Sequence, residues 1–291
     1  MRFRFNGHSK SFLAIAAAVL LTGSTSPSKA QQAVKVDQKA LLDQVRHAYY
    51  LPLDRGVQGF SCNVSFDWAA VLERASGRKI SSKEATVVSL KSATTTVTND
   101  YAKGAVAKGT YPGTQPLAGS PVASRQKILN NLVKASLDGW DPFLSNRIFP
   151  LEATTYRFES VPTGYRLTLD GGTFFSILDL DPKLKVTHGE SHLNGTTTEF
   201  TPEFDTSTHG WLLTSLKTVT THAATGLAAE TKAASSSTSP EDEDKASFIY
   251  SYQFVDDLLV PKHVIVQYGE GQETPYDLTD CTLTKAAQTK P

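Results

Sequence analysis

The sequence is short of cysteine, methionine, surplus charge and long apolar runs, and each shortage excludes a class of protein. Its 291 residues include two cysteines and one methionine, and 29 basic side chains balance 29 acidic ones. So few cysteines exclude a disulfide-built mini-protein and a cysteine-rich zinc protein. The balanced charge is not that of a nucleic-acid-binding protein. The sequence contains no run of 18 apolar residues, so no permanent membrane span is predicted. Hydrophobic residues make up 40% of the chain, which is too many for a disordered protein.

The first 30 residues have the pattern of a cleavable signal peptide. Three basic side chains within the first ten residues precede an apolar run over residues 12–21, and small residues at positions 28 and 30 suit a signal peptidase. We therefore expect cleavage after Ala30 and an exported, periplasmic protein. The alternative is an uncleaved membrane anchor, but the run is shorter than the roughly 20 residues that a bilayer core requires.

Removal of this segment leaves 25 basic against 29 acidic residues, a net charge of −4. A mildly acidic surface without basic clusters offers no electrostatic attraction to nucleic acid or to anionic lipid headgroups. The charge pattern therefore predicts that nucleic acid is not a partner of the mature protein.

The two cysteines, Cys62 and Cys281, lie far apart in the sequence. An oxidising compartment outside the cytoplasm favours a disulfide between them. This disulfide would join the first predicted strand to the last and would contribute roughly 5 kcal/mol if it acts by restricting the unfolded chain. The alternative is a pair of buried thiols that act as small hydrophobic side chains.

A helix and then a strand open the mature chain. Asp37 can cap a helix that runs to about residue 50, because apolar side chains recur there at helical spacing. Apolar residues then alternate with polar ones over residues 59–68, which is the pattern of a strand with one buried face. The alternating apolar side chains are Phe60, Cys62, Val64, Phe66 and Trp68.

Residues 69–150 differ in character, and we expect them to form a helical insertion that acts as a lid. They contain two short helical segments, the second after a Ser81–Glu84 capping box. A Thr-rich, extended stretch follows, and then a Gly- and Pro-rich loop over residues 108–120. Ser120 caps the strongest predicted helix, which begins with a proline and is expected to end at Gly139.

From Tyr156 onward the pattern is strand and turn, which is typical of an antiparallel meander. Asn194-Gly195 is the strongest hairpin signal, since both turn positions need a positive φ. Residues 223–247 lack aromatic side chains and contain an acidic run, so we expect a disordered acidic loop there. The expected strands flank the turn at residues 162–164 and cover residues 173–180, 183–193, 196–204, 211–221, 248–254, 262–268 and 276–284.

These elements predict an α+β fold, namely a curved antiparallel sheet (an unclosed half-barrel) covered by helices. The segments 59–68, 195–221 and 248–266 resemble the periplasmic lipoprotein carriers and their relatives, the outer-membrane lipoprotein-sorting (LolA-like) superfamily. The resemblance includes Gly-Trp-Leu-Leu at 210–213 and Asp-Asp-Leu-Leu-Val-Pro at 256–261. It implies an unclosed barrel under a helical lid, with a cavity that holds acyl chains in several members.

The resemblance also implies one LolA-like domain over residues 31–291 and a function as an exported carrier for the acyl part of a lipid or lipoprotein. Two aromatic stripes, on two different strands, are the candidates for lining such a cavity. The alternative is that these side chains only pack the core. The candidate ligand-binding residues are Phe60, Val64, Phe66, Trp68, Phe248, Tyr250, Tyr252 and Phe254.

Two other classes of function stay open. A carboxylate-dependent envelope hydrolase would use Asp179 or Asp256, although aspartates at such positions more often form turns. A non-catalytic interaction module would bind an envelope protein. No nucleotide- or metal-binding motif of known spacing occurs, so no cofactor and no metal are predicted. His188, Glu190 and His192 lie too far apart along a strand to share one metal unless the strand bends.

Overall fold

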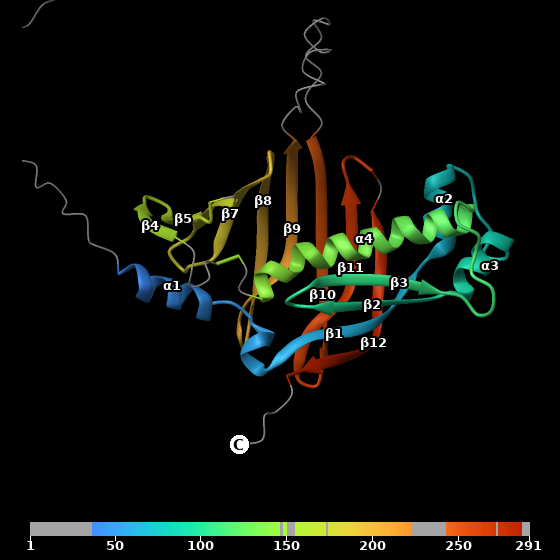
Figure 1. Ribbon diagram of the computed structural model, residues 1–291, viewed down its shortest axis with the longest axis horizontal. Coiled ribbons are helices and arrows are strands. Elements are labelled where there is room, and N and C mark those ends of the chain that lie inside the picture. Colours follow the sequence, from blue (N-terminus) through green and yellow to red (C-terminus); the bar gives the residue numbers. More distant parts are fainter. Residues whose placement is uncertain are drawn as a thin grey trace, which may run out of the picture. The chain divides into compact units, whose positions relative to one another are not determined.

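Twelve antiparallel strands form one sheet in this structure, which is a computed structural model (Figure 1). Their order is β3-β2-β1-β12-β11-β10-β9-β8-β7-β6-β5-β4. Among the described residues, β3 and β4 are the two edges, so the sheet is unclosed. The strands are β1 Val57–Phe66, β2 Thr94–Asp100, β3 Gly104–Thr110, β4 Thr155–Val161, β5 Gly164–Asp170, β6 Phe174–Leu180, β7 Val186–Leu193, β8 Thr196–Ser207, β9 Gly210–His222, β10 Glu243–Val255, β11 Leu258–Tyr268 and β12 Thr274–Lys285.

The structure describes residues 37–145, 148–149, 155–172, 174–222, 243–271 and 273–286. All of them belong to one compact unit, Val36–Pro291. The predicted signal peptide lies outside the described residues, as does the 223–242 part of the predicted acidic loop. Residues 243–247, which the sequence pattern assigns to that loop, instead begin β10, because their backbones pair with β9.

The tight turns of the meander use residues that tolerate a positive φ. Asn194 (φ 51°) and Gly195 (φ 76°) join β7 to β8, which confirms the predicted hairpin. Asp256 (φ 47°) and Asp257 (φ 63°) join β10 to β11 in the same manner. Such short connections put consecutive strands side by side, and the meander from β4 to β12 follows from them.

The helices begin and end at capping residues that the sequence indicates. The Asp37 carboxylate accepts a hydrogen bond from Ala40 N at 3.1 Å, and Ser120 Oγ accepts one from Ala123 N at 3.2 Å. Gly77 ends α2 with a φ of 67°. The helices are α1 Gln38–His47, the 3-10 helix η1 Pro52–Arg55, α2 Trp68–Ser76, α3 Ala85–Ser92 and α4 Pro121–Leu144.

The helix α4 continues past Gly139, where the sequence pattern predicts its end, and reaches Leu144. A Cβ atom at Gly139 would lie 3.2 Å from Leu216 Cδ2, so the glycine allows α4 to approach β9 closely. The turn that follows buries Trp140 and Phe143. The prediction of an end at Gly139 was therefore wrong, because burial of this last turn outweighs the roughly 1 kcal/mol cost of a helical glycine.

The predicted helical insertion over residues 69–150 also contributes two strands. Its Thr-rich part forms β2, which pairs with β1, and β3 then pairs with β2. The helix α3 begins at Ala85, later than the capping box suggests, although Ser81 N still donates to Glu84 Oε1 at 3.3 Å. Figure 1 shows α4 lying across the sheet, where it contacts β2, β3, β9 and β11. The insertion is thus both an edge of the sheet and its cover.

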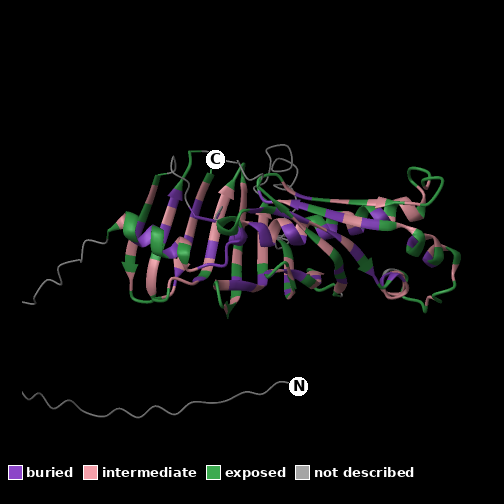
Figure 2. Ribbon diagram, turned by 90° about the horizontal axis from the view of Figure 1, so that it is seen from below, coloured by how far each residue is buried: buried purple, intermediate pink, exposed green. Residues whose placement is uncertain are grey.

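Aromatic side chains connect α4 to the sheet beneath it, and buried residues lie on both (Figure 2). Tyr250 Oη donates to Ser136 O at 2.7 Å, and Tyr276 Oη lies 2.6 Å from Ser136 Oγ. Trp140 Nε1 donates to Tyr252 Oη at 2.9 Å. Burial raises the pKa of all three tyrosines, because a phenolate would lose its hydration there. These phenols are therefore structural hydrogen-bonding groups of the interface.

Cys62 and Cys281 form a disulfide, as the sequence predicts. Cys62 lies on β1 and Cys281 on β12, and these two strands are antiparallel neighbours in the sheet. The bond connects positions 219 residues apart. It therefore joins the first strand of the chain to the last.

Candidate functional site

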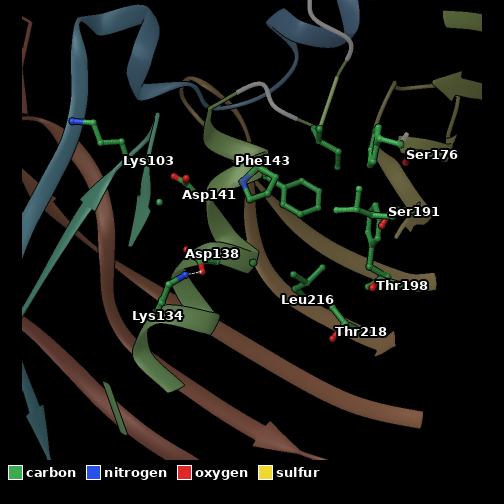
Figure 3. Close-up of a pocket in the computed structure, with 17 residues that line it drawn as sticks. Lys103, Lys134, Asp138, Asp141, Phe143, Ser176, Ser191, Thr198, Leu216 and Thr218 are labelled. Atoms are coloured by element: carbon green, nitrogen blue, oxygen red, sulfur yellow. Dashed lines mark hydrogen bonds and ion pairs between the residues drawn. The ribbon is translucent and has the colours of Figure 1, made fainter. Parts of the chain in front are cut away.

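A pocket of about 700 Å³ lies between the C-terminal half of α4 and the sheet face of β6, β7, β8 and β9. We call it the α4 pocket (Figure 3). Its volume falls within the roughly 300–1,000 Å³ of small-molecule sites. The pocket has three parts, which differ in chemistry: a wall of hydroxyl groups, an apolar wall and a charged side.

Small side chains in one row of the sheet create the hollow. Ser176 lies opposite Ser191 in the β6–β7 pair, Ser191 lies opposite Thr198 in the β7–β8 pair, and Thr198 lies opposite Thr220 in the β8–β9 pair. Cross-strand partners point to the same face of a sheet. Four adjacent strands therefore present short side chains on this face. Those that line the pocket are Ser176, Ser191, Thr198 and, two residues from Thr220 on β9, Thr218, and they are too small to fill the space beneath the helix.

Apolar side chains form a second wall. Phe143 on α4 packs against Phe200 on β8 with a ring-centroid distance of 6.2 Å, and Leu216 on β9 lies beside them in the pocket lining. Phe174 and Leu193 face each other across β6 and β7, and 36% and 49% of their surfaces are exposed. Apolar surface thus continues from the interior of the pocket to solvent, as a ligand with a hydrocarbon part would require.

Charged side chains occupy the side of the pocket nearest α4 and the β2–β3 turn (Figure 3). Lys134 and Asp138 form an ion pair one helical turn apart. Lys103 pairs with Asp100 at 3.5 Å, while Asp141 is buried in the same wall. The two lysine side chains are 52% and 83% exposed, so each can turn its ammonium group toward a ligand. The pocket is therefore amphipathic.

The eight residues predicted to line a cavity do not line the α4 pocket. Six of them are buried in the hydrophobic core, namely Phe60, Val64, Phe66, Trp68, Phe248 and Tyr250. Trp68 begins α2 and does not belong to the predicted strand, because β1 ends at Phe66. Tyr252 is half-buried and hydrogen-bonded to Trp140, and Phe254 is 74% exposed. Phe60, for example, packs against Trp140 at 5.8 Å between ring centroids. Ligand contact by these eight residues stays a prediction.

The sequence does not reveal the pocket, because the residues that line it show no distinctive pattern. Ser191 and Thr198 belong to strands whose side chains alternate without marked hydrophobicity. The informative feature is the coincidence of short side chains in neighbouring strands, and the Asn194-Gly195 hairpin sets that register for β7 and β8. Phe143 was not expected to line the pocket, because the helix was predicted to end at Gly139, before this residue.

The two carboxylates considered for hydrolysis, Asp179 and Asp256, have structural partners, as does the neighbouring Asp181. Asp179 forms a bidentate ion pair with Arg166 at 2.7 and 3.0 Å. Asp181 accepts hydrogen bonds from the backbone of the β6–β7 turn, and Asp256 pairs with Lys285 at 3.3 Å. None of these aspartates lines the α4 pocket. They stabilise strands and turns.

Nothing in the described part of the chain forms a metal site of three or more histidine, cysteine or acidic side chains. His192 Nε2 instead contacts Glu190 Oε1 at 2.7 Å. The helices described here include none that is long and apolar enough to cross a membrane.

Comparisons of this chain with protein-family models, with curated proteins and with solved structures found no match. The fold is an unclosed antiparallel sheet with a helix across one face and an amphipathic pocket at their contact. Function therefore has to be argued from the pocket.

Proposed function

We propose that this protein is an exported, periplasmic binding or carrier protein that holds the acyl part of a lipid or lipoprotein in the α4 pocket. The observation that carries the proposal is the combination of an apolar wall, from Phe143 to the exposed Phe174, with a charged side bearing Lys103 and Lys134. An amphiphile has the same two parts. The predicted signal peptide and the resemblance to LolA-like carriers support the same function.

The physical basis of such binding is apolar burial. Each methylene group that leaves water contributes about 0.8 kcal/mol, so an acyl chain can be retained without a specific hydrogen bond to its hydrocarbon part. Lys103 and Lys134, which are paired with Asp100 and Asp138, would exchange these partners for an anionic carboxylate or phosphate of the ligand at the same time. Selectivity for chain length is then expected to be loose.

The first experiment is mass spectrometry of organic extracts from the mature protein purified from its native envelope, followed by titration with a fluorescent fatty acid. We expect about one lipid per protein molecule. A variant that fills the pocket, Ser191→Trp, should weaken fatty-acid binding at least about tenfold, since the indole occupies space that the chain needs. The matched control is Thr201→Trp on β8, where the side chain is exposed and outside the pocket lining.

Three results would contradict the proposal. One is absence of lipid from the gently purified protein together with absence of fatty-acid binding. Another is equal binding by Ser191→Trp and Thr201→Trp when both variants retain the thermal transition of the parent protein. Recovery of a stoichiometric envelope protein without lipid would instead support the interaction module.

A further inference from the structure

We infer that the acyl chain held in the α4 pocket is hydroxylated near its head group. This inference rests on the proposed function and specifies its substrate class. The carrying observation is that four hydroxyl side chains from four adjacent strands line one wall of the pocket: Ser176, Ser191, Thr198 and Thr218. Figure 3 shows them on the sheet side of the pocket, with Phe143 between them and the charged side chains of α4.

The four hydroxyl groups differ in what they already bind. Ser176 Oγ donates to Glu190 O at 2.9 Å, and Thr198 Oγ1 lies 3.3 Å from Thr220 Oγ1. The hydroxyls of Ser191 and Thr218 have no hydrogen-bond partner among the described residues, although both side chains are half-buried. The wall therefore retains both donors and acceptors for a ligand.

A plain hydrocarbon is a poor match for this wall. A chain pressed against Ser191 and Thr218 would remove water from their hydroxyl groups and would return no hydrogen bond, which costs free energy. A hydroxyl group on the chain both donates and accepts, so it compensates for that loss. The opposite wall, which contains Phe143 and Leu216, still buries the methylene groups.

The expected position of the ligand's hydroxyl group depends on Lys134 and the hydroxyl wall lining the same pocket. Lys134 and the hydroxyl wall line the same hollow of about 700 Å³. A ligand with its anionic head group beside Lys134 and a hydroxyl beside Ser191 has to reach past Phe143 within this one hollow, so we expect the two groups at the same end of the ligand. The chemical class is a fatty acid or acyl lipid with its hydroxyl a few carbons from the carboxyl or ester group.

The test compares 3-hydroxytetradecanoate with tetradecanoate by isothermal titration calorimetry on the mature protein. We expect the hydroxylated acid to bind about three- to tenfold more tightly, the effect of one or two hydrogen bonds formed in place of hydration. The double variant Ser191→Ala/Thr218→Val should bring this ratio to about one. Its affinity for tetradecanoate should be unchanged or higher, because the wall becomes more apolar. The variant Thr218→Ser keeps a hydroxyl and should keep the preference.

Each outcome separates this inference from the proposed function. Absence of binding of either acid to the parent protein overturns the proposed function and this inference with it. Equal binding of the two acids to the parent protein overturns only the inference. A preference that survives in the double variant, with the thermal transition intact, also overturns it, because the hydroxyl wall would then not be the group that recognises the ligand. The exposed substitution Thr201→Val is the control and should leave the ratio as in the parent protein.

Discussion

At the level of single residues, Gly189 shapes the α4 pocket. It lies directly opposite Phe200 in the β7–β8 pair, and a Cβ atom there would be 2.1 Å from Phe200 Cζ. The aromatic ring thus lies against the backbone of β7. Any side chain at position 189 would force the ring to move, and the ring is part of the pocket lining.

We therefore expect Gly189→Ala to lower the free energy of unfolding by about 1–3 kcal/mol, as overpacking does in cores, and to weaken fatty-acid binding. Urea denaturation and ligand titration measure the two effects. The control is Gly171→Ala, where a Cβ atom would meet ordinary contacts of 3.6 Å or more and the loss should stay within about 0.5 kcal/mol. Equal stability and equal binding of the two variants would contradict this role of Gly189.

The tyrosine phenol groups buried under α4 make stability sensitive to alkaline pH. Burial raises the pKa of Tyr250, Tyr252 and Tyr276, whereas an unfolded tyrosine ionises near pH 10. Below that pH the phenols are neutral in both states, and their contribution to stability is complete. As the pH rises further, ionisation in the unfolded chain favours unfolding.

The free energy of unfolding should therefore fall above about pH 10, by about 1.4 kcal/mol per pH unit for each buried tyrosine. Chemical denaturation at a series of pH values measures this slope. The variant Tyr250→Phe should be less steep than the parent protein by the contribution of one tyrosine, whatever its stability at neutral pH. An unchanged slope in that variant would argue against the burial of this phenol.

At the level of elements, α1 protects the edge strand β4. Gln38 Nε2 donates to Phe158 O at 3.1 Å, and Phe158 N donates to Gln38 Oε1 at 2.5 Å. The side-chain amide takes the place of a neighbouring strand at the centre of this edge. Unprotected edges invite pairing with other chains, so this contact opposes self-association.

Substitution of Gln38 by alanine should expose the edge, lower the free energy of unfolding by about 1–2 kcal/mol and increase self-association. Analytical ultracentrifugation over a range of concentrations measures the association. Gln44→Ala, an exposed position on the same helix, is the control and should remain like the parent protein. An equally monomeric Gln38→Ala protein would show that the edge is protected by other means.

Across the whole molecule, the disulfide connects β1 and β12, which are the first and last strands in the sequence. Because 219 residues separate Cys62 from Cys281, the bond greatly restricts the unfolded chain. The double variant Cys62→Ala/Cys281→Ala should lose about 3–5 kcal/mol of unfolding free energy. Denaturation of the parent protein with and without a reductant should reproduce the loss, and the double variant should not respond to the reductant. If a reductant left the free energy of unfolding of the parent protein unchanged, the expectation would be contradicted.

Local signals predicted most elements of the fold. Alternation of polar and apolar residues identified β1 and the meander, Asp37 and Ser120 marked helix starts, and Asn194-Gly195 marked a hairpin. These signals succeed because a cap, a turn and an alternating strand depend on a few neighbouring residues. The errors at Gly139 and at residues 243–247 arose where packing with distant strands outweighs local preference.

The sequence by itself determined the order of the elements, the antiparallel meander and the pair of cysteines available for a bond across it. Only the tertiary structure decided where space remains. The aromatic stripes with Phe60 and Phe248 fill the region beneath α4, whereas short side chains of four adjacent strands leave a hollow beside Phe143. The reason is physical: a cavity depends on which side chains meet across strands and on how closely a helix approaches them, and neither is encoded within one stretch of sequence.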